Sequence, residues 1–325
     1  MAADFRIFRS LEEATSAFGP CALTIGNFDG VHVGHRHILR RVREVAEENN
    51  WKASVMMFDP HPTRVVAPAR APLLMTTPEQ RCQLMRAEGI VQALILPFNQ
   101  AVAHLTPEEF VERVLVRGLD ARAVLVGENF RFGHKQAGDT ASLSALGRHF
   151  GFRTEVIPAV SCRGVVVSSS AVRRLVLAGD VSRAWRLLAR PFALEGRVVP
   201  GHGIGSKKTV PTLNLDTNFE VLPAGGVYVT RTTDLDDART WPSVTNIGFR
   251  PTFDGDQLSI ESYLLEPLTG ETPRRIGVEF LRRVRDERKF SDPESLKAQI
   301  MRDVARAQSY HRRLRKWTIC YHKKL

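Results

Sequence analysis

The chain has 325 residues, of which 43% are hydrophobic, and it carries a net charge of +11 at pH 7. This composition is ordinary for globular proteins, and the length suggests about two domains that each bury a core. No apolar run is long enough to span a bilayer, and the first residues, MAADFRIFRS, lack the apolar segment of a signal peptide. We therefore expect a cytoplasmic protein without a membrane anchor.

The positive charge has two interpretations. It would suit a nucleic-acid-binding protein, and it would equally suit an enzyme whose substrates all carry phosphate. The chain contains no arginine-rich low-complexity segment, zinc finger or RNA-binding aromatic motif, so we expect a solvated basic surface and no nucleic-acid partner. The cysteines are far apart and lack the spacing of metal ligands, which favours reduced core residues; they are Cys21, Cys82, Cys162 and Cys320.

In the first half of the chain, short apolar runs that suit buried strands alternate with segments of helical periodicity. The apolar runs are 22–25, 53–58, 93–97, 123–126 and 154–157, and the helical segments are 38–49, 78–89, 107–117, 141–151 and 170–178. Such alternation predicts a Rossmann-like parallel sheet with helices on both faces, over residues 1–189. Ligands of such sheets bind beyond the carboxyl ends of the strands.

The stretch that follows the first of these runs is rich in glycine and histidine, and the whole of Leu23–His37 reads LTIGNFDGVHVGHRH. A strand, a tight turn and a helix start bring free backbone N–H groups and the positive end of a helix dipole to one place, which suits phosphate. Imidazoles can add donors to the same anion. Taken alone, the pattern also fits a surface turn with idle histidines. The candidate residues are Gly26, Asn27, Phe28, His32, Gly34 and His35.

Three further loops follow later strands. Pro60 and Pro62 fix the backbone around His61, so its imidazole is aimed; the alternative is a rigid surface loop. The segment Gly127–Gly133 combines an amide with aromatic rings, and its Asn129 and Phe132 could hold a planar ring and a phosphate.

The third loop, SSSAVR at 168–173, predicts a helix N-cap in which Ser169, Ser170 and Arg173 form a second anion site. A plain N-cap with a solvated arginine is the alternative.

From about residue 190 the pattern changes to strand-like segments without helical crossovers. This predicts an antiparallel β-barrel or sandwich over residues 190–325, closed by an amphipathic helix at Pro293–Leu314. A glycine-rich loop near its start could form an anion nest, although a flexible hairpin is the alternative. The loop candidates are Gly201, Gly203, Gly205 and Lys207.

Strand alternation places Thr212 and Asn214 on one face of the next extended segment. Both offer neutral oxygen ligands, which suit Mg²⁺ when ATP phosphates supply the charge. Further along, Glu261 stands in a strand-like run between apolar neighbours and is a candidate general base. Solvated polar residues on an exposed strand face are the alternative for all three.

Together these stretches resemble the bacterial bifunctional riboflavin kinase/FAD synthetase family. TIGNFDGVHVGH resembles the nucleotidylyltransferase signature of that family, and the Pro-His-Pro turn, the Gly127–Gly133 loop and the SSSAVR run match its next three motifs in order. The later stretches resemble its riboflavin kinase module through Pro-Thr-x-Asn, Asn-Ile-Gly-x-x-Pro-Thr-Phe and a following glutamate. The resemblance covers about Thr24 to Phe290.

The resemblance implies an FMN adenylyltransferase domain over 1–189 and a riboflavin kinase domain over 190–325. Riboflavin and ATP would give FMN and ADP, and FMN and ATP would then give FAD and pyrophosphate, with Mg²⁺ as cofactor and ATP as co-substrate. Thr212 and Asn214 would bind Mg²⁺-ATP, Glu261 would deprotonate the ribityl hydroxyl, and Asn246 and Arg285 would contact ligand. The oligomeric state stays open, weak self-association included.

One departure from the family pattern concerns the nucleotide loop. The usual Gly-Arg-x-Leu-Gly-Phe-Pro-Thr reads GSKKTVPT at 205–212, so an arginine, a glycine and a phenylalanine are replaced, and Lys207 or Lys208 would have to supply the charge. Two alternatives follow. One is an FMN adenylyltransferase with an inactive, flavin-binding barrel, and the other is a basic nucleic-acid-binding protein.

Overall fold

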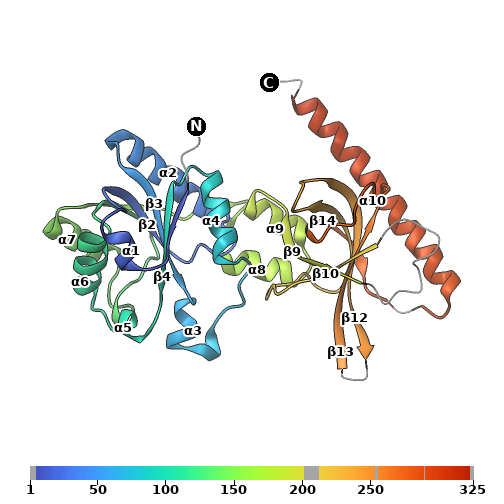
Figure 1. The fold of residues 1–325 in the computed structure, drawn as a ribbon, viewed down its shortest axis with the longest axis horizontal. Helices are drawn as coiled ribbons and strands as arrows, with labels where there is room; N and C mark the ends of the chain where they lie inside the picture. Colours follow the sequence, from blue (N-terminus) through green and yellow to red (C-terminus); the bar gives the residue numbers. More distant parts are fainter. Residues whose placement is uncertain (1–4, 201–211, 253–254, 289, 323–325) are drawn as a thin grey trace. The chain divides into compact units, whose positions relative to one another are not determined.

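The computed structural model describes residues 5–200, 212–252, 255–288 and 290–322. Its chain divides into two compact units, Met1–Ala171 and Val172–Leu325, which are described separately (Figure 1). The first contains a parallel sheet, and the second contains a closed antiparallel barrel followed by a terminal helix. This confirms the predicted fold class and decides between barrel and sandwich. No helix within the described ranges is long and apolar enough to cross a membrane.

The sheet of the first unit has six strands, all paired in parallel, in the order β1-β4-β3-β2-β5-β6. They are β1 (Arg6–Phe8), β2 (Cys21–Ile25), β3 (Lys52–Asp59), β4 (Gln92–Pro97), β5 (Ala121–Gly127) and β6 (Arg153–Ile157). The order of the strands reverses between β2 and β5, so the connections after these two strands leave in opposite directions. A ligand crevice forms at such a point.

All five helical segments expected in this half are present. The helices are α1 (Leu11–Thr15), α2 (Val33–Asn49), α3 (Pro62–Val66), α4 (Pro78–Ala87), α5 (Gln100–Ala103), α6 (Pro107–Phe110), α7 (Thr140–Phe150) and α8 (Ser169–Leu177), and a π-helical segment, Val111–Gly118, continues α6. A small hairpin pairs β7 (Ser161–Cys162) with β8 (Val165–Val166). Helix α2 begins earlier than its apolar periodicity suggests, because His32 caps it.

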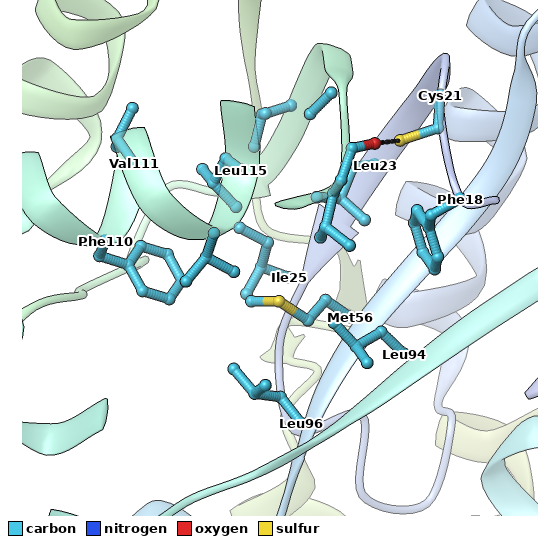
Figure 2. Packing of buried hydrophobic residues seen from close by; sticks show 14 of the residues in the cluster. Phe18, Cys21, Leu23, Ile25, Met56, Leu94, Leu96, Phe110, Val111 and Leu115 are labelled. Atoms are coloured by element: carbon cyan, nitrogen blue, oxygen red, sulfur yellow. Dashed lines mark hydrogen bonds between the residues drawn. The ribbon is translucent and has the colours of Figure 1, made fainter. Parts of the chain in front are cut away.

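Every residue of β2 is buried, as its continuous apolar sequence predicts. Leu23 and Ile25 belong to a cluster with α6 and the π-helical segment, which includes Phe110 and Leu115 (Figure 2). Ala22 belongs to a second cluster on the other face of the sheet, with α2 and α4. The strand that carries the first motif is therefore fixed by packing on both sides. Burial also raises the pKa of the Cys21 thiol to about 12, as expected for a reduced core cysteine.

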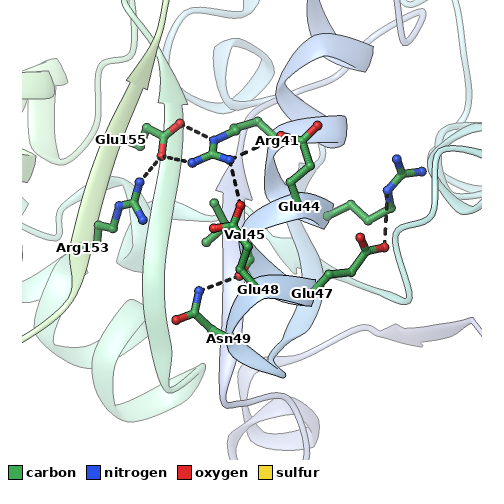
Figure 3. Close-up of polar contacts among 9 residues, drawn as sticks. Arg41, Glu44, Val45, Glu47, Glu48, Asn49, Arg153 and Glu155 are labelled. Carbon is green, nitrogen blue, oxygen red and sulfur yellow. Dashed lines mark hydrogen bonds and ion pairs between the residues drawn. The ribbon is translucent and has the colours of Figure 1, made fainter.

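An ion-pair cluster ties α2 to the edge of the sheet (Figure 3). Arg41 on α2 donates to both carboxylate oxygens of Glu155 on β6, from Nε at 2.7 Å and from Nη2 at 3.3 Å. Arg153 donates to the same carboxylate at 2.7 Å. The hydrogen bond from Arg41 lowers the pKa of Glu155. This contact holds the helix whose N-terminus begins at the first motif.

The barrel of the second unit closes in the order β10-β13-β12-β11-β14-β9. Its strands are β9 (Phe192–Val199), β10 (Thr212–Asp216), β11 (Gly226–Asp234), β12 (Thr240–Thr252), β13 (Gly255–Leu264) and β14 (Arg275–Asp286). Helix α9 (Val181–Leu188) packs on β14 and β9. The terminal helix α10 (Pro293–His322) contains the predicted segment, extends beyond it, and packs on β11 and β12.

Hydroxyl groups fill the middle of the barrel. Hydrogen bonds of 2.6 to 3.2 Å join these fully buried side chains, namely Thr230, Thr232, Ser243, Thr245 and Ser262. Residues one position away, such as Val229 and Val244, instead pack outward in a cluster with Ala307 of α10. Because side chains alternate along a strand, the neighbours Asn246 and Glu261 also lie on the outer face.

Candidate functional site

A cavity of about 770 Å³ opens at the switch point between β2 and β5. Three of the four predicted loops of the first half line it: the turn after β2, the Pro-His-Pro turn after β3, and the loop after β5. Five phenylalanines also line it, namely Phe58, Phe98, Phe110, Phe130 and Phe132. The structure therefore brings these motifs together around one cavity, called the aromatic cavity below, and its phenylalanine rings suit a planar ligand.

The turn after β2 holds an unusual backbone. Phe28 and Val31 have φ values of 50° and 39°, and Gly30 lies between them at 79°. Non-glycine residues adopt this left-handed region only at a cost, which the surroundings must offset. Phe28 is buried among core residues, and its ring edge contacts His35. Phe28 thus packs under the turn, while Gly26 and Asn27 line the cavity.

The two predicted histidines stack at the start of α2. Their ring centroids are 3.6 Å apart and the planes differ by 14°. His32 is the N-cap, and its Nδ1 accepts the backbone N–H of His35 at 3.3 Å. A Cβ on Gly34 would lie 3.2 Å from the His32 ring, so glycine lets the backbone pass close to it. His32 and His35 are not among the described residues that line the aromatic cavity.

His35 is a buried imidazole with one ring nitrogen, Nδ1, that lacks a hydrogen-bond partner among the described residues. Burial lowers the pKa of His35 well below its usual range, and positive charge at His32 and Arg81 acts in the same direction. At neutral pH the ring is therefore neutral. An anion would supply both the missing hydrogen bond and compensating charge.

Two buried charged residues hold the turn in place, and the sequence did not single them out. Arg81 of α4 donates to the carbonyl of Asn27 at 2.7 Å, although it is only 2% exposed. Asp29 accepts the N–H of Met75, the N–H of Thr76 and the hydroxyl of Thr76 through Oδ1, at 2.9 to 3.1 Å. For Arg81, the only indication in the sequence was a polar residue within the amphipathic segment of α4.

The Pro-His-Pro turn and the loop after β5 both place their predicted residues at the cavity. Nε2 of His61 lies 3.0 Å from Nδ2 of Asn27, and Nδ1 of His61 caps α3 by accepting the N–H of Thr63 at 3.3 Å. Asn129 is exposed at the cavity, and the buried Phe132 pairs with Gly138 through two backbone hydrogen bonds.

The serine run begins α8. Ser169 donates its hydroxyl to the carbonyl of Asp29 at 2.9 Å, so it joins this helix to the turn after β2. Ser168 accepts the N–H of Ala171 at 3.2 Å, and Ser170 is exposed. Arg173 follows on the same helix, beyond the point where the two compact units divide. The predicted N-cap geometry is thus present, and its hydroxyls include one in direct contact with the first motif.

In the barrel, the strand register brings three predicted residues side by side. Asn214 of β10 pairs with Glu261 of β13, and Glu261 pairs with Asn246 of β12. Paired residues on antiparallel strands point to the same face. Thr212 lies two positions before Asn214 on that face, and the alternate residues Leu213 and Leu215 are buried, as the alternation predicted.

The carboxylate of Glu261 has a defined partner on its own strand. Ser259 donates its hydroxyl to Oε1 of Glu261 at 2.9 Å. Both side chains are half-buried. Among the described residues, no group of three or more histidines, cysteines, aspartates or glutamates could hold a metal. The face therefore offers one oriented carboxylate beside amide and hydroxyl oxygens.

Arg285 takes part in a contact that docks α10 on β14. Its Nε donates to Asp303 at 2.8 Å, and Asp303 is 2% exposed and also accepts from Gln299 at 2.8 Å. The predicted loop residues Gly201, Gly203, Gly205 and Lys207 lie outside the described residues.

Comparison with known proteins identifies both units. A family model described as FAD synthetase matches residues 14–171, and one described as riboflavin kinase matches residues 188–311. The bifunctional riboflavin kinase/FMN adenylyltransferase of Pseudomonas fluorescens is 38% identical over 305 residues, which cover 94% of this chain and 97% of that protein. The chain belongs to this bifunctional family. It is therefore a riboflavin kinase and FMN adenylyltransferase, with ATP as co-substrate.

One further relative carries the same name, and one solved structure shares the fold. The Escherichia coli K12 protein of the same name is 35% identical over 290 residues, which cover 89% of this chain and 92% of that protein. A crystal structure titled macrolide-efflux protein, from Streptococcus pneumoniae, matches with a TM-score of 0.81 at 25% identity, over 93% of this chain and 98% of that chain. The kinase/adenylyltransferase family thus accounts for nearly the whole chain.

Proposed function

We propose that the barrel phosphorylates riboflavin on the outer face of β10, β13 and β12, and that the parallel-sheet unit adenylylates the FMN formed. The observation that carries this assignment is the register that sets Asn214, Glu261 and Asn246 side by side. A neutral alcohol must lose its proton during phosphoryl transfer, and Glu261 is the carboxylate within that row.

In the kinase step, Glu261 takes the proton of the ribityl 5′-hydroxyl while its oxygen attacks the γ-phosphorus of ATP. The bond from that phosphorus to the bridging oxygen breaks, and ADP leaves. The hydrogen bond from Ser259 to Oε1 restricts the orientation of the Glu261 carboxylate. Holding the base in one geometry removes part of the entropic cost of reaching the transition state.

Thr212 and Asn214 would hold Mg²⁺ together with the ATP phosphates. The donor set fits this ion, because both side chains present neutral oxygens on one strand face and the phosphates bring the negative charge. When bound, Mg²⁺ neutralises charge that develops on the phosphate oxygens. Asn246, in register beyond Glu261, would donate its amide to the same ligands.

In the adenylyl transfer, an oxygen of the FMN phosphate attacks the α-phosphorus of ATP and pyrophosphate leaves. This nucleophile is already ionised, so the protein needs no general base. It must align two polyanions and stabilise the charge of the transition state. We assign that role to His32, His35 and the N-terminus of α2, with the hydroxyls of Ser169 and Ser170 and the guanidinium of Arg173 as further donors. The aromatic cavity would receive the isoalloxazine ring, bounded by His61 and Asn129.

A time course with purified protein tests this proposal. Riboflavin, ATP and Mg²⁺ are incubated together, and the flavins are separated by chromatography. We expect FMN to accumulate first and FAD to follow. Unchanged riboflavin, with FAD formed only from supplied FMN, would instead show that the altered loop at 205–210 disables the kinase. No product from either substrate would contradict both assignments.

A further inference from the structure

Two histidines that belong to none of the four motifs stack on the wall of the aromatic cavity. His104 follows α5 and His134 follows Gly133, and both line the cavity. Their ring centroids are 5.1 Å apart, and the planes differ by 20°. They come from segments 30 residues apart in the sequence, so this arrangement is created by the fold.

The backbone fixes the segments that carry these rings. The N–H of His134 donates to the carbonyl of Leu105 at 2.7 Å, which joins the two segments directly. Gly133 has a φ of 72°, and a Cβ there would lie 2.8 Å from the backbone nitrogen of Pro107. Only glycine lets the loop approach α6 this closely. The pair is therefore held in place before any ligand arrives.

The hydrogen bonds of the two rings determine which nitrogen carries the proton. Nδ1 of His104 lies 2.6 Å from the carbonyl of Gln100, and Nδ1 of His134 lies 3.1 Å from the carbonyl of Ala103. A carbonyl oxygen can only accept, so both Nδ1 atoms must carry hydrogen. A neutral ring in this tautomer has its lone pair on Nε2. Each histidine thus presents a hydrogen-bond acceptor on a rigid support.

The rest of the cavity determines what such an acceptor could recognise. Five phenylalanine side chains line it, which suits the faces and the dimethylbenzene edge of a flavin. Those parts of the ring have no hydrogen-bonding groups. The pyrimidine edge does, and its N3–H is a donor that needs an acceptor when it leaves water.

We propose that the His104–His134 pair recognises the pyrimidine edge of FMN, with a histidine Nε2 accepting the N3–H of the isoalloxazine ring. This inference rests on the proposed adenylylation of FMN in this unit. It assigns the pair a role in flavin selection, separate from the phosphate chemistry at His32 and His35. The phosphate end of FMN would then lie toward the turn after β2, where Gly26 and Asn27 also line the cavity.

The test compares FMN with 3-methyl-FMN, which lacks the N3–H, in the adenylylation reaction. The wild-type enzyme should have a KM for 3-methyl-FMN about 3- to 10-fold higher than for FMN, the loss expected for one neutral hydrogen bond. The double variant His104→Phe/His134→Phe keeps two stacked rings but loses both acceptors. Its KM for FMN should rise by a similar factor, its preference for FMN over the analogue should fall to about 1, and its KM for ATP should not change.

A matched control is His149→Phe, because the His149 ring makes a T-shaped contact with Phe150 of α7, outside the residues that line the cavity. It should behave as wild type toward both flavins. Equal KM values for the two flavins in the wild type would overturn the inference without any variant. So would an unchanged preference in the double variant, or a rise in its KM for ATP alone. Failure of the wild type to convert FMN to FAD would instead overturn the underlying function.

Discussion

The two units assemble their candidate sites from different parts of the secondary structure. In the parallel-sheet unit the residues come from loops that follow β2, β3 and β5, and their positions depend on buried supports such as Arg81 and Asp29. In the barrel they come from the middle of three hydrogen-bonded strands, where the register places Asn214, Glu261 and Asn246 side by side. A loop site can be reshaped by distant contacts, whereas a register site is fixed by the ladder itself.

The largest effect should come from removing the base of the barrel site. Glu261→Gln keeps the size of the side chain and its strand position but cannot accept the proton, so FMN formation should fall by about 10²- to 10⁴-fold. FAD synthesis from supplied FMN should stay near the wild-type rate. Both rates are measured by separating the flavins. Retained kinase turnover would remove Glu261 as the base.

The reciprocal change tests the loop site. His32→Ala removes both a stacked imidazole and the N-cap of α2, and adenylyl transfer should fall by about 10²- to 10³-fold, as for loss of one charge-stabilising donor. Riboflavin phosphorylation should continue. Arg173→Ala should lower the same activity, and a near-normal rate in either variant would exclude that residue from phosphate binding.

A smaller effect should show how much the orientation of the Glu261 carboxylate adds to the kinase rate. Ser259→Ala removes the hydroxyl that bonds Oε1 of Glu261, and we expect the kinase kcat to fall by about 3- to 10-fold, in line with one hydrogen bond. The KM for ATP should stay unchanged, and Ser259→Thr should restore most of the rate. An unchanged kcat in the alanine variant would mean that the register alone orients the base.

Acid should weaken both units through buried histidines. Burial lowers the pKa of His35 in the first unit and of His311 in the barrel; Nε2 of His311 lies 3.0 Å from the carbonyl of Thr230. Between the lowered pKa and the usual value near 6.5, the unfolded chain binds more protons than the folded one. Stability is therefore complete above that value and declines as the pH falls below it.

Urea unfolding at pH 7.5 and pH 5.5 measures this decline. Each histidine contributes at most about 1.4 kcal/mol per pH unit. His311→Gln should reduce the pH dependence of barrel unfolding and leave that of the first unit unchanged. If the unfolding free energy of the variant changed with pH as in the wild type, His311 would be excluded as a cause of the decline.

The smallest effect should come from the ion pairs on α2. Arg41→Ala removes the two hydrogen bonds to Glu155. Because both side chains are only about a quarter exposed, this change should lower the stability of the first unit by about 1 kcal/mol. Arg113→Ala breaks a more exposed pair, with Glu109, and its effect should be smaller because water screens that pair. Equal losses in thermal or urea unfolding would show that the bond from α2 to β6 adds nothing.

The same contrast explains what could be predicted from the sequence. The apolar run of β2 and the alternation around Leu213 and Leu215 are local patterns, so the strands and their buried faces were predictable. The strand β1 was not, because it has only three residues. Periodicity also failed to give the true start of α2, which a capping side chain decides.

The candidate sites were predictable as residues but not as arrangements. The motifs around His32 and Glu261 were recognisable from neighbouring residues and from a family resemblance. The buried pair of supports, Arg81 and Asp29, bonds backbone atoms about 50 positions away, and the stacking of His104 on His134 depends on how two loops meet. Such contacts are set by tertiary packing, which a local pattern does not contain.

The most direct test of two separate sites joined by FMN is a mixing experiment. Glu261→Gln and His32→Ala proteins are each incubated with riboflavin, ATP and Mg²⁺, alone and together. Alone, the first should leave riboflavin unchanged and the second should stop at FMN. Together they should produce FAD after a lag, because FMN released by one protein is adenylylated by the other. Absence of FAD in the mixture, while each variant keeps its remaining activity, would contradict the assignment of the two steps to independent sites.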